Sequence, residues 1–307
     1  MITFKNLIFT SIILFSNFSW GTEFNCEPTD QINWERLADG VEWTKYELAF
    51  TPYFKDKHAW ATTKSKKVTV RAFKIDYALN QLLFHRSAKD LVCNPAGEVY
   101  IKKLIDDSKS PVIGAVNANF FVMPNGNILG IAIDEKKAWS KKLDNLAISS
   151  AGVLSIQNGI TALEARDQLV SRHGNVISNA DATKYSFAVQ GYPKLVNNDT
   201  IQISDAVKDV KVPRTSIGFA KNQNDLYLVT INADDFGGEI TQYGMTLFEY
   251  AHFIKDARCG VGQKNVLNLD GGGSTAFAIP SKKIFHQADR CRHLGNILTI
   301  QSRSKQN

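Results

Sequence analysis

Hydrophobic and polar residues alternate with the two-residue period of β-strands along much of this chain. Residues 67–76 place Val68, Val70 and Ala72 on one face and polar or charged neighbours on the other, a pattern typical of a half-buried strand. Residues 225–232 form the clearest predicted strand, with Leu226, Leu228 and Ile231. Further strands are predicted at residues 41–50, 111–116, 128–134, 152–157, 184–195, 215–220, 266–269, 275–279 and 297–301.

Two segments follow the helical period of 3.6 residues instead. They are residues 98–108 and residues 246–258, the second with Thr246 available as N-cap. Two helices cannot cover a fully parallel sheet, so the pattern predicts an α+β fold with mixed or mostly antiparallel sheets and few helices. Without a fixed-period repeat or a low-complexity linker, residues 41–302 are expected to form a single domain, preceded by an irregular lead-in at residues 22–40.

The first 21 residues are typical of a secretory signal peptide. Lys5 is followed by an apolar run at residues 7–15 and then by the small residues Ser19 and Gly21. That run is shorter than the roughly 20 residues that a membrane helix needs, although a short N-terminal anchor is the competing interpretation. We therefore expect cleavage after Gly21, no stable membrane span, and export to the periplasm or outside the cell.

Export to an oxidising compartment would allow the four cysteines to form disulfides. Cys26, Cys93, Cys259 and Cys291 all follow the predicted cleavage site, and an even number in an oxidising compartment predicts two disulfides. Three pairings are open. We favour Cys26–Cys93 and Cys259–Cys291, because the second pair would clamp loops that flank the glycine-rich motif described below. A zinc site is the alternative, but no two cysteines have Cys-x-x-Cys spacing, so no metal is predicted.

Composition adds little beyond an ordinary globular chain. The 307 residues are 44% hydrophobic, and the formal net charge is +6. Lysine and arginine are scattered, with no basic helix and no aromatic–basic alternation, so no nucleic acid partner is predicted.

The motif richest in chemical groups is Asn-Leu-Asp-Gly-Gly-Gly-Ser-Thr at residues 268–275. A buried strand would deliver Asp270 to its end, and the glycines would let backbone N–H groups approach a ligand. Such N–H groups can bind an anion, and the hydroxyls of Ser274 and Thr275 add donors. The alternative is a glycine-rich turn that Asp270 merely caps. The Gly-Lys-Ser/Thr ending of a nucleotide-binding P-loop is absent.

Several motifs in order resemble the phosphodiester glycosidase family. They are residues 268–275, Gly244-Met245-Thr246 before the second helix, and Arg-Thr-Ser-Ile-Gly at residues 214–218. The run 117–121 is similar to the family's Asn-Gly-Gly-Phe-Phe motif, with Asn119 in place of a glycine. Gln190 with residues 193–196, and Arg292 with Asn296, resemble two further family segments. The resemblance covers roughly residues 112–301.

The resemblance implies an enzyme that hydrolyses the glycosidic bond of a sugar-1-phosphodiester, similar to N-acetylglucosamine-1-phosphodiester, in a glycan, polysaccharide or glycolipid. Such a reaction needs a carboxylate near the anomeric carbon, for which Asp270 is the first candidate and Asp234 the second. Arg214 and Arg292 suit the phosphate, because a guanidinium matches two phosphate oxygens. The remaining expected substrate contacts are Asn117, Asn119, Gln190, Asn268, Gly271, Gly272, Gly273, Ser274, Thr275 and Asn296.

No cofactor is expected, and the partner is a saccharide phosphate. Two alternatives stay open: a glycosidase acting on glycosides without phosphate, and a carbohydrate-binding protein of the same fold without catalysis. Arg214 paired with Asp234 as a structural ion pair is also compatible with the sequence. The identity of the sugar, the stereochemical outcome and the oligomeric state are not fixed by these motifs.

Overall fold

The computed structural model describes most of the chain after the predicted signal peptide. The described residues are 26–28, 31–50, 66–86, 99–108, 110–123, 125–135, 137–144, 151–204, 210–220, 225–232 and 244–303. The predicted signal peptide, Cys93 and Asp234 lie outside them.

The largest sheet has nine strands in the order β1-β3-β4-β17-β16-β18-β14-β15, with β2 paired to β3. Its long strands are β3 (Val41–Phe50), β4 (Lys66–Asp76) and β17 (Asp225–Asn232). The others are β1 (Cys26–Pro28), β2 (Glu35–Ala38), β14 (Lys194–Asn197), β15 (Thr200–Ile201), β16 (Arg214–Phe219) and β18 (Asn265–Asn268).

Two five-stranded sheets pack beside the large one. The first has the order β20-β19-β6-β21-β5 and the second β10-β9-β13-β11-β12. Their strands are β5 (Asn80–His85), β6 (Gly114–Asn117), β9 (Ala132–Asp134), β10 (Lys137–Ser140), β11 (Gly152–Gln157), β12 (Ile160–Ala165), β13 (Phe187–Gly191), β19 (Ala276–Ile279), β20 (Ile284–Gln287) and β21 (Ile297–Ser302). A two-stranded hairpin, β7 (Phe121–Val122) and β8 (Asn127–Ile128), completes the strands described. Every strand pair among the described residues is antiparallel, in agreement with the expected mostly antiparallel α+β fold.

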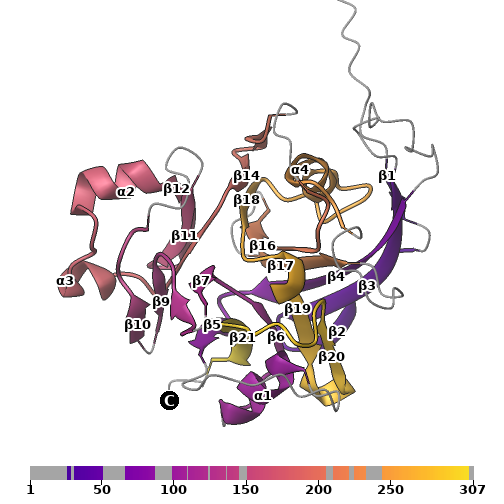
Figure 1. Ribbon diagram of the computed structural model, residues 1–307, viewed down its shortest axis with the longest axis horizontal. Coiled ribbons are helices and arrows are strands. Elements are labelled where there is room, and N and C mark those ends of the chain that lie inside the picture. Colours follow the sequence, from indigo (N-terminus) through magenta and orange to yellow (C-terminus); the bar gives the residue numbers. More distant parts are fainter. Residues whose placement is uncertain are drawn as a thin grey trace, which may run out of the picture.

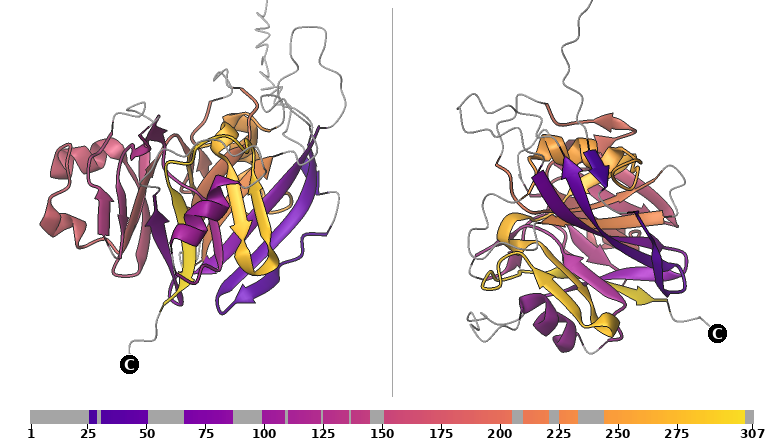
Figure 2. Two further views of the ribbon diagram at one scale, coloured as in Figure 1. Left: turned by 60° about the horizontal axis from the view of Figure 1, so that its bottom comes forward. Right: turned by 90° about the vertical axis from the view of Figure 1, so that its right-hand side faces the viewer.

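Four described α-helices cover the outer faces of these sheets (Figure 1). They are α1 (Tyr100–Asp107), α2 (Arg166–His173), α3 (Asn179–Ala182) and α4 (Leu247–Lys255). Helix α4 packs on one face of the large sheet, α1 on β6 and β19, and α2 and α3 on the second small sheet. Figure 2 shows β3 and β4 along the flank of the molecule opposite α2 and α3. In the part of the chain described, no helix is long and apolar enough to cross a membrane.

One hydrophobic core is shared by all three sheets. It includes Phe73 of the large sheet, Phe277 of β19 and Phe187 of β13, all fully buried. The rings of Phe73 and Phe277 stack with their centroids 4.4 Å apart. Because the large sheet faces both smaller sheets across this core, the loops at the ends of their strands come together from distant parts of the sequence.

The sequence pattern predicted the long strands and the helices α1 and α4. Strands β3, β11 and β17 have the predicted bounds, and Thr246 caps α4 by accepting a hydrogen bond from the Glu249 N–H at 3.1 Å. Helices α2 and α3 and strands β5, β10, β12 and β20 were not predicted.

Three predicted segments were wrong in detail. The lead-in at residues 22–40 contains β1 and β2, which pair with β3 as short edge strands. The strand predicted at 128–134 is interrupted at Gly130, whose φ of 80° favours glycine. The strand predicted at 184–195 is divided into β13 and β14, with the cis Tyr192–Pro193 peptide between them.

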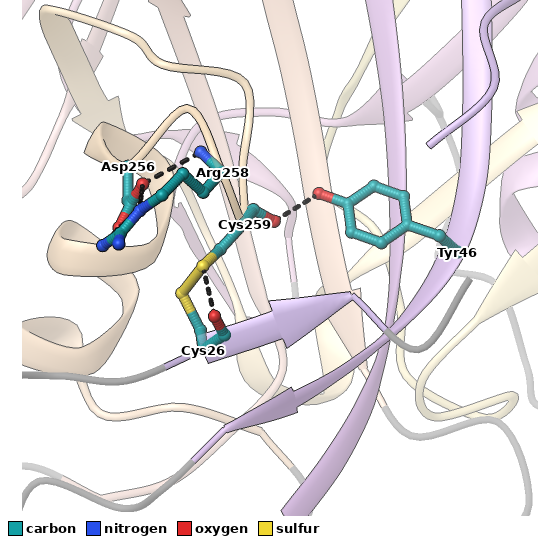
Figure 3. The surroundings of a disulfide bond; sticks show 5 residues. All are labelled: Cys26, Tyr46, Asp256, Arg258 and Cys259. Atoms are coloured by element: carbon teal, nitrogen blue, oxygen red, sulfur yellow. Dashed lines mark hydrogen bonds and ion pairs between the residues drawn. A yellow bond between two sulfur atoms is a disulfide. The ribbon is translucent and has the colours of Figure 1, made fainter. Parts of the chain in front are cut away.

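The favoured disulfide pairing was also wrong, because Cys26 is bonded to Cys259 (Figure 3). Strand β1 runs along β3 and thereby brings Cys26 next to the loop after α4. The Tyr46 hydroxyl of β3 donates a hydrogen bond to the Cys259 carbonyl at 2.9 Å and holds this loop in place. Cys291 is disulfide-bonded as well. The prediction paired Cys259 with Cys291 because both flank the glycine-rich motif in the sequence. In the fold, strand pairing instead brings together two cysteines that are 233 positions apart.

Candidate functional site

Asp270 lies immediately beyond β18, where the large sheet meets β6 of the first small sheet. Its backbone N–H donates to the Ala118 carbonyl at 3.0 Å. Its carbonyl accepts a hydrogen bond of 2.5 Å from the side-chain amide of Asn117, the last residue of β6. The Asn117 side-chain oxygen in turn accepts from the Thr215 hydroxyl at 2.6 Å and from the Ala276 N–H at 3.0 Å. Asn117 therefore fixes the position of Asp270 by joining three strands.

Burial raises the pKa of the Asp270 carboxyl from 3.8 to about 6. Smaller effects from the Ser274 hydroxyl, the Gly271 N–H and the Arg292 charge act in the opposite direction. The Gly271 N–H donates to the carboxylate at 2.9 Å. A carboxyl with a pKa close to 6 is ionised at neutral pH yet still basic, which suits it for proton transfer or nucleophilic attack.

The three glycines allow the loop after Asp270 to turn tightly. Gly272 has a φ of 59°, a conformation that disfavours other residues. A Cβ atom on Gly273 would come within 3.1 Å of the Asp289 Cβ and 3.5 Å of the Arg292 Cγ. This close approach places the loop containing Asp289 and Arg292 directly against the glycines.

Four backbone N–H groups of this loop are bonded within the fold, which limits the anion cradle that the sequence suggested. The Gly271 N–H binds the Asp270 carboxylate, and the Gly272 N–H donates to the Pro213 carbonyl at 2.8 Å. The N–H groups of Ser274 and Thr275 donate to loop carbonyls at 3.2 and 3.1 Å. These four donors are already used within the fold, so side chains would supply most of the remaining contacts to a ligand.

Suitable side-chain groups lie beside them. The hydroxyls of Ser274 and Thr275 are buried and form no well-directed hydrogen bond among the described residues, although the Ser274 hydroxyl is near enough to Asp270 to lower the pKa of that carboxyl. The side-chain oxygen of Asn268 is in the same condition, while its amide donates to the Tyr192 carbonyl at 2.7 Å. A buried polar atom without a partner carries a free-energy cost that a bound ligand can relieve.

The two arginines predicted to bind phosphate have different surroundings. Arg292 is exposed at the rim, and its charge interacts with the Asp270 carboxyl. Arg214 is buried, and its guanidinium donates to the carbonyls of Met245 at 2.9 Å and Val210 at 2.7 Å. The structure therefore places Arg292 against the glycine loop and within electrostatic reach of Asp270, whereas Arg214 donates to backbone carbonyls on the side of the sheet that α4 covers.

Three amides predicted to contact a sugar instead join loops to one another. Asn296 accepts from the Asn119 N–H at 2.9 Å and donates to its carbonyl at 3.1 Å. The Asn119 side chain donates to the carbonyls of Ile131 and Gln190 at 2.9 and 3.1 Å. The Gln190 side chain bonds to the backbone of Asp144 and Ile131. All three side chains are buried, and their contact with a substrate stays a prediction.

A polar row that the motifs did not indicate crosses the inner face of the large sheet near Asn117. Thr215, Thr230 and Arg71 are direct neighbours on β16, β17 and β4. Arg71 donates to the side-chain oxygen of Asn232 at 2.6 Å, and the Asn232 amide is hydrogen-bonded to His286. The sequence did contain an indication of this polar row. On β4 and β17, the residues that point into the core are apolar at one end of the strand and polar at the end near Asn117.

The described residues contain one cluster with the composition of a metal site, Cys26, Asp256 and Cys259. Its two sulfur atoms form the disulfide (Figure 3), so this cluster does not offer free thiolates to a cation.

Comparisons with known proteins bear on the family and the fold. The chain is 26% identical over 196 residues to mouse N-acetylglucosamine-1-phosphodiester alpha-N-acetylglucosaminidase, which covers 58% of this chain and 34% of the mouse protein. The chain thus spans about a third of the length of that relative. The catalytic domain of the zebrafish enzyme of the same name superposes with a TM-score of 0.59 at 17% identity, over 91% of this chain and 88% of that one. A hypothetical protein from Synechocystis superposes with a TM-score of 0.55 at 12% identity, over 91% and 68% of the two chains.

These structural likenesses concern the fold, whereas the family is shown by the sequence. The model of the phosphodiester glycosidase family matches residues 110–301, which is more than half of the chain and includes Asn117, Asp270 and Arg292. With the ordered motifs and the carboxylate at the end of β18, the chain belongs to the phosphodiester glycosidase family.

Proposed function

We propose that this protein is an exported hydrolase that cleaves the bond between a sugar and the phosphate of a sugar-1-phosphodiester. The observation that carries the proposal is the set of groups around Asp270. This carboxyl has a pKa of about 6, interacts with the positive charge of Arg292, and lies beside the buried hydroxyl of Ser274, which forms no well-directed hydrogen bond in the described structure. Few sites on the surface of a structural domain combine these properties.

The reaction assigns one role to each of these groups. Asp270 attacks the anomeric carbon or removes a proton from the water that does so, as the bond from that carbon to the phosphate oxygen breaks. If Asp270 is the nucleophile, water then hydrolyses the ester between the sugar and Asp270 and releases the free sugar. The electron pair of the broken bond goes to the phosphate, which leaves as a monoester. Because a phosphate is a good leaving group, electrostatic stabilisation by Arg292 matters more than a strong general acid. The hydroxyls of Ser274 and Thr275 are available to bind the sugar or the phosphate.

The names of the relatives support N-acetylglucosamine as the sugar. The compartment is supported by the Cys26–Cys259 disulfide, since disulfides persist in oxidising compartments. We extend the proposal accordingly to an N-acetylglucosamine-1-phosphodiester-like linkage in an envelope glycan, polysaccharide or glycolipid.

The test is hydrolysis of a small soluble substrate, the methyl phosphodiester of N-acetylglucosamine-1-phosphate, in water labelled with ¹⁸O. Cleavage at the anomeric carbon places the label in the free sugar, whereas cleavage at phosphorus places it in the phosphate. Asp270→Asn should fold and lose turnover by at least about a thousandfold. Asp225→Asn is the matched control, because Asp225 begins β17 at the opposite end of the same sheet. Label in the phosphate, or full activity of Asp270→Asn, would contradict the proposal.

One observation favours the alternative of a glycosidase that acts on glycosides without phosphate. The Arg214 guanidinium donates to two backbone carbonyls, so only Arg292 remains as an arginine near Asp270 that could bind a phosphate. A glycosidase acting on sugars without phosphate would need neither arginine for its leaving group. Arg292→Ala separates the two functions: it should lower kcat/KM for the phosphodiester by about 10- to 1000-fold, but leave hydrolysis of a nitrophenyl glycoside unchanged.

A further inference from the structure

A cleft lies at the end of the large sheet opposite Asp270. It has a volume of about 630 Å³, which is within the range of small-molecule sites. The turn after β4, the turn after β9, the β11–β12 turn, the loop before β13 and the residue after β21 form its walls. In the register of the large sheet, Ile75 of β4 is level with Asn265, at the start of β18. Asp270 is five residues beyond Asn265, so the cleft is at least about 17 Å from Asp270 at about 3.3 Å per strand residue.

The side chains of this cleft are held in place before any ligand binds. Arg303 forms an ion pair with Glu135, and its Nε donates to the Tyr77 carbonyl at 3.1 Å. The Arg303 guanidinium also lies 4.6 Å from the centroid of the Tyr77 ring. A guanidinium with three such constraints loses little conformational entropy when a ligand binds to it.

One buried group in the cleft lacks a partner. Tyr77 is only 7% exposed and lines the cleft, yet its hydroxyl has no hydrogen-bond partner among the described residues. Ser186 and Arg303 are near enough to lower the pKa of Tyr77, against a larger increase caused by burial. Neither forms a well-directed hydrogen bond with the hydroxyl. The group is therefore available to a ligand in the cleft.

The charges in the cleft argue against an anion. Arg303 is neutralised by Glu135, and Lys184 by Asp181 at 2.7 Å. An anion would gain little from cations that already have carboxylate partners, and it would be repelled by Glu135. An apolar ligand would bury the Tyr77 hydroxyl and leave it without a hydrogen bond. A neutral ligand rich in hydroxyls can form hydrogen bonds with both the donors and the acceptors that line the cleft.

From these contacts we propose that the cleft bounded by Tyr77, Glu135, Asn158, Lys184, Ser186 and Arg303 is a second binding site, and that its ligand is a neutral saccharide unit. The Arg303–Glu135 pair presents donors and an acceptor side by side, which matches neighbouring hydroxyls of a sugar ring. The Tyr77 hydroxyl and the amide of Asn158 bind further hydroxyls. This site does not depend on the chemistry at Asp270, and on a glycan polymer it would hold a segment remote from the bond that is cleaved.

The proposal is tested by NMR titration of the ¹⁵N-labelled protein with neutral oligosaccharides of N-acetylglucosamine, glucose or mannose, and separately with inorganic phosphate. An oligosaccharide should shift the amide signals of Ala78, Gly159 and Ser186. Tyr77→Phe should weaken that binding by about two- to tenfold, the effect of one lost hydrogen bond. Tyr227→Phe is the matched control, because Tyr227 is 8% exposed and lies on the α4 side of the large sheet.

Three results of the titration would overturn the proposal. The first is that no saccharide shifts the amide signals of the cleft, and the second is that Tyr77→Phe binds saccharide as tightly as the wild type. The third is that phosphate shifts these signals but no saccharide does. Hydrolysis of the small methyl phosphodiester is measured in parallel and should be the same in wild type and Tyr77→Phe. If the wild-type protein does not hydrolyse the methyl phosphodiester, the proposed function is refuted but the saccharide-binding result at the cleft still stands. The two failures are therefore distinguishable.

Discussion

Replacing Thr275 by valine should make the protein more stable and less active. Thr275 follows the glycine loop and precedes β19, is fully buried, and its hydroxyl has no partner in the described structure. Valine has nearly the same shape but no hydroxyl. Mutational data put the cost of a buried hydroxyl without a partner at about 1–3 kcal/mol. Removing that cost should raise the free energy of unfolding by about 1 kcal/mol and the melting temperature by about 2–4 °C.

Activity should change in the opposite direction. In the proposed function the Thr275 hydroxyl binds the sugar or the phosphate, so valine leaves a ligand group without its hydrogen bond. The expected loss is about 1–1.5 kcal/mol of transition-state binding, which corresponds to about a tenfold lower kcat/KM. Urea denaturation measures the first effect, and hydrolysis of the methyl phosphodiester measures the second.

Thr299→Val is the matched control on β21. Thr299 is as deeply buried as Thr275, but its hydroxyl donates to the Leu83 carbonyl at 3.2 Å and accepts from the Gln301 side chain at 3.3 Å. Its replacement should lower the free energy of unfolding by about 1 kcal/mol and leave kcat/KM unchanged. If Thr275→Val were destabilised as much as Thr299→Val, its hydroxyl would have a partner in the fold and the reasoning would fail.

Three further predictions concern charge, covalent linkage and packing. The pKa of Asp270 is raised to about 6 in the fold, so stability should fall as pH rises from about 4 to about 6. Urea denaturation should therefore show Asp270→Asn about 1–3 kcal/mol more stable than wild type at pH 7.5, but equal to it at pH 3.5. The kcat/KM of the wild type should have an acidic limb with a pKa near 6, which a flat profile between pH 5 and 8 would contradict. Replacing Cys26 and Cys259 by serine should lower the free energy of unfolding by about 2–5 kcal/mol, and an unchanged denaturation midpoint would show that the disulfide is dispensable. Gly114→Ala should cost at least about 1–3 kcal/mol, because its Cβ would lie 2.4 Å from the Phe73 ring; wild-type stability of this variant would mean that the ring can move aside.

Much of the fold could be predicted because its longest elements have strong periodicity. Strand β4 alternates Val68, Val70 and Ala72 with polar or aromatic neighbours, β3 and β17 are uninterrupted runs of 10 and 8 residues rich in strand-forming residues, and α4 has both an apolar face and a capping box. Strand β5 was missed because its buried Leu82, Leu83 and Phe84 are consecutive and show no alternation. Helix α2 was missed because it buries only Arg166 and Leu169, too few residues to produce a helical period.

The candidate site shows the limit of reasoning from residue types. The motif containing Asp270, Ser274 and Thr275 could be found because these residues are adjacent in the sequence. Asn117 is 153 positions from Asp270, and only the ordered family motifs placed the two in one site. Which arginine reaches Asp270 depends on which backbone carbonyls lie within reach of each guanidinium, and no local pattern records this. Arg214 was therefore indistinguishable from Arg292 until the fold was known.

The distribution of unsatisfied groups favours a site over a structural turn. In the described residues, nine buried side-chain atoms lack a hydrogen-bond partner, and three of them belong to Asn268, Ser274 and Thr275. A turn that served only the fold would gain stability by replacing these residues with apolar ones, because folding selects against buried groups without partners. Their concentration beside a carboxyl of raised pKa is instead expected where a ligand completes the hydrogen bonds. The same reasoning applies to Tyr77 in the cleft, and it leads to an opposite expectation for the two sites. Removing a hydroxyl of the motif near Asp270, as in Thr275→Val, should weaken ligand binding and lower turnover. Removing the Tyr77 hydroxyl should weaken saccharide binding in the cleft but leave turnover of a small substrate unchanged.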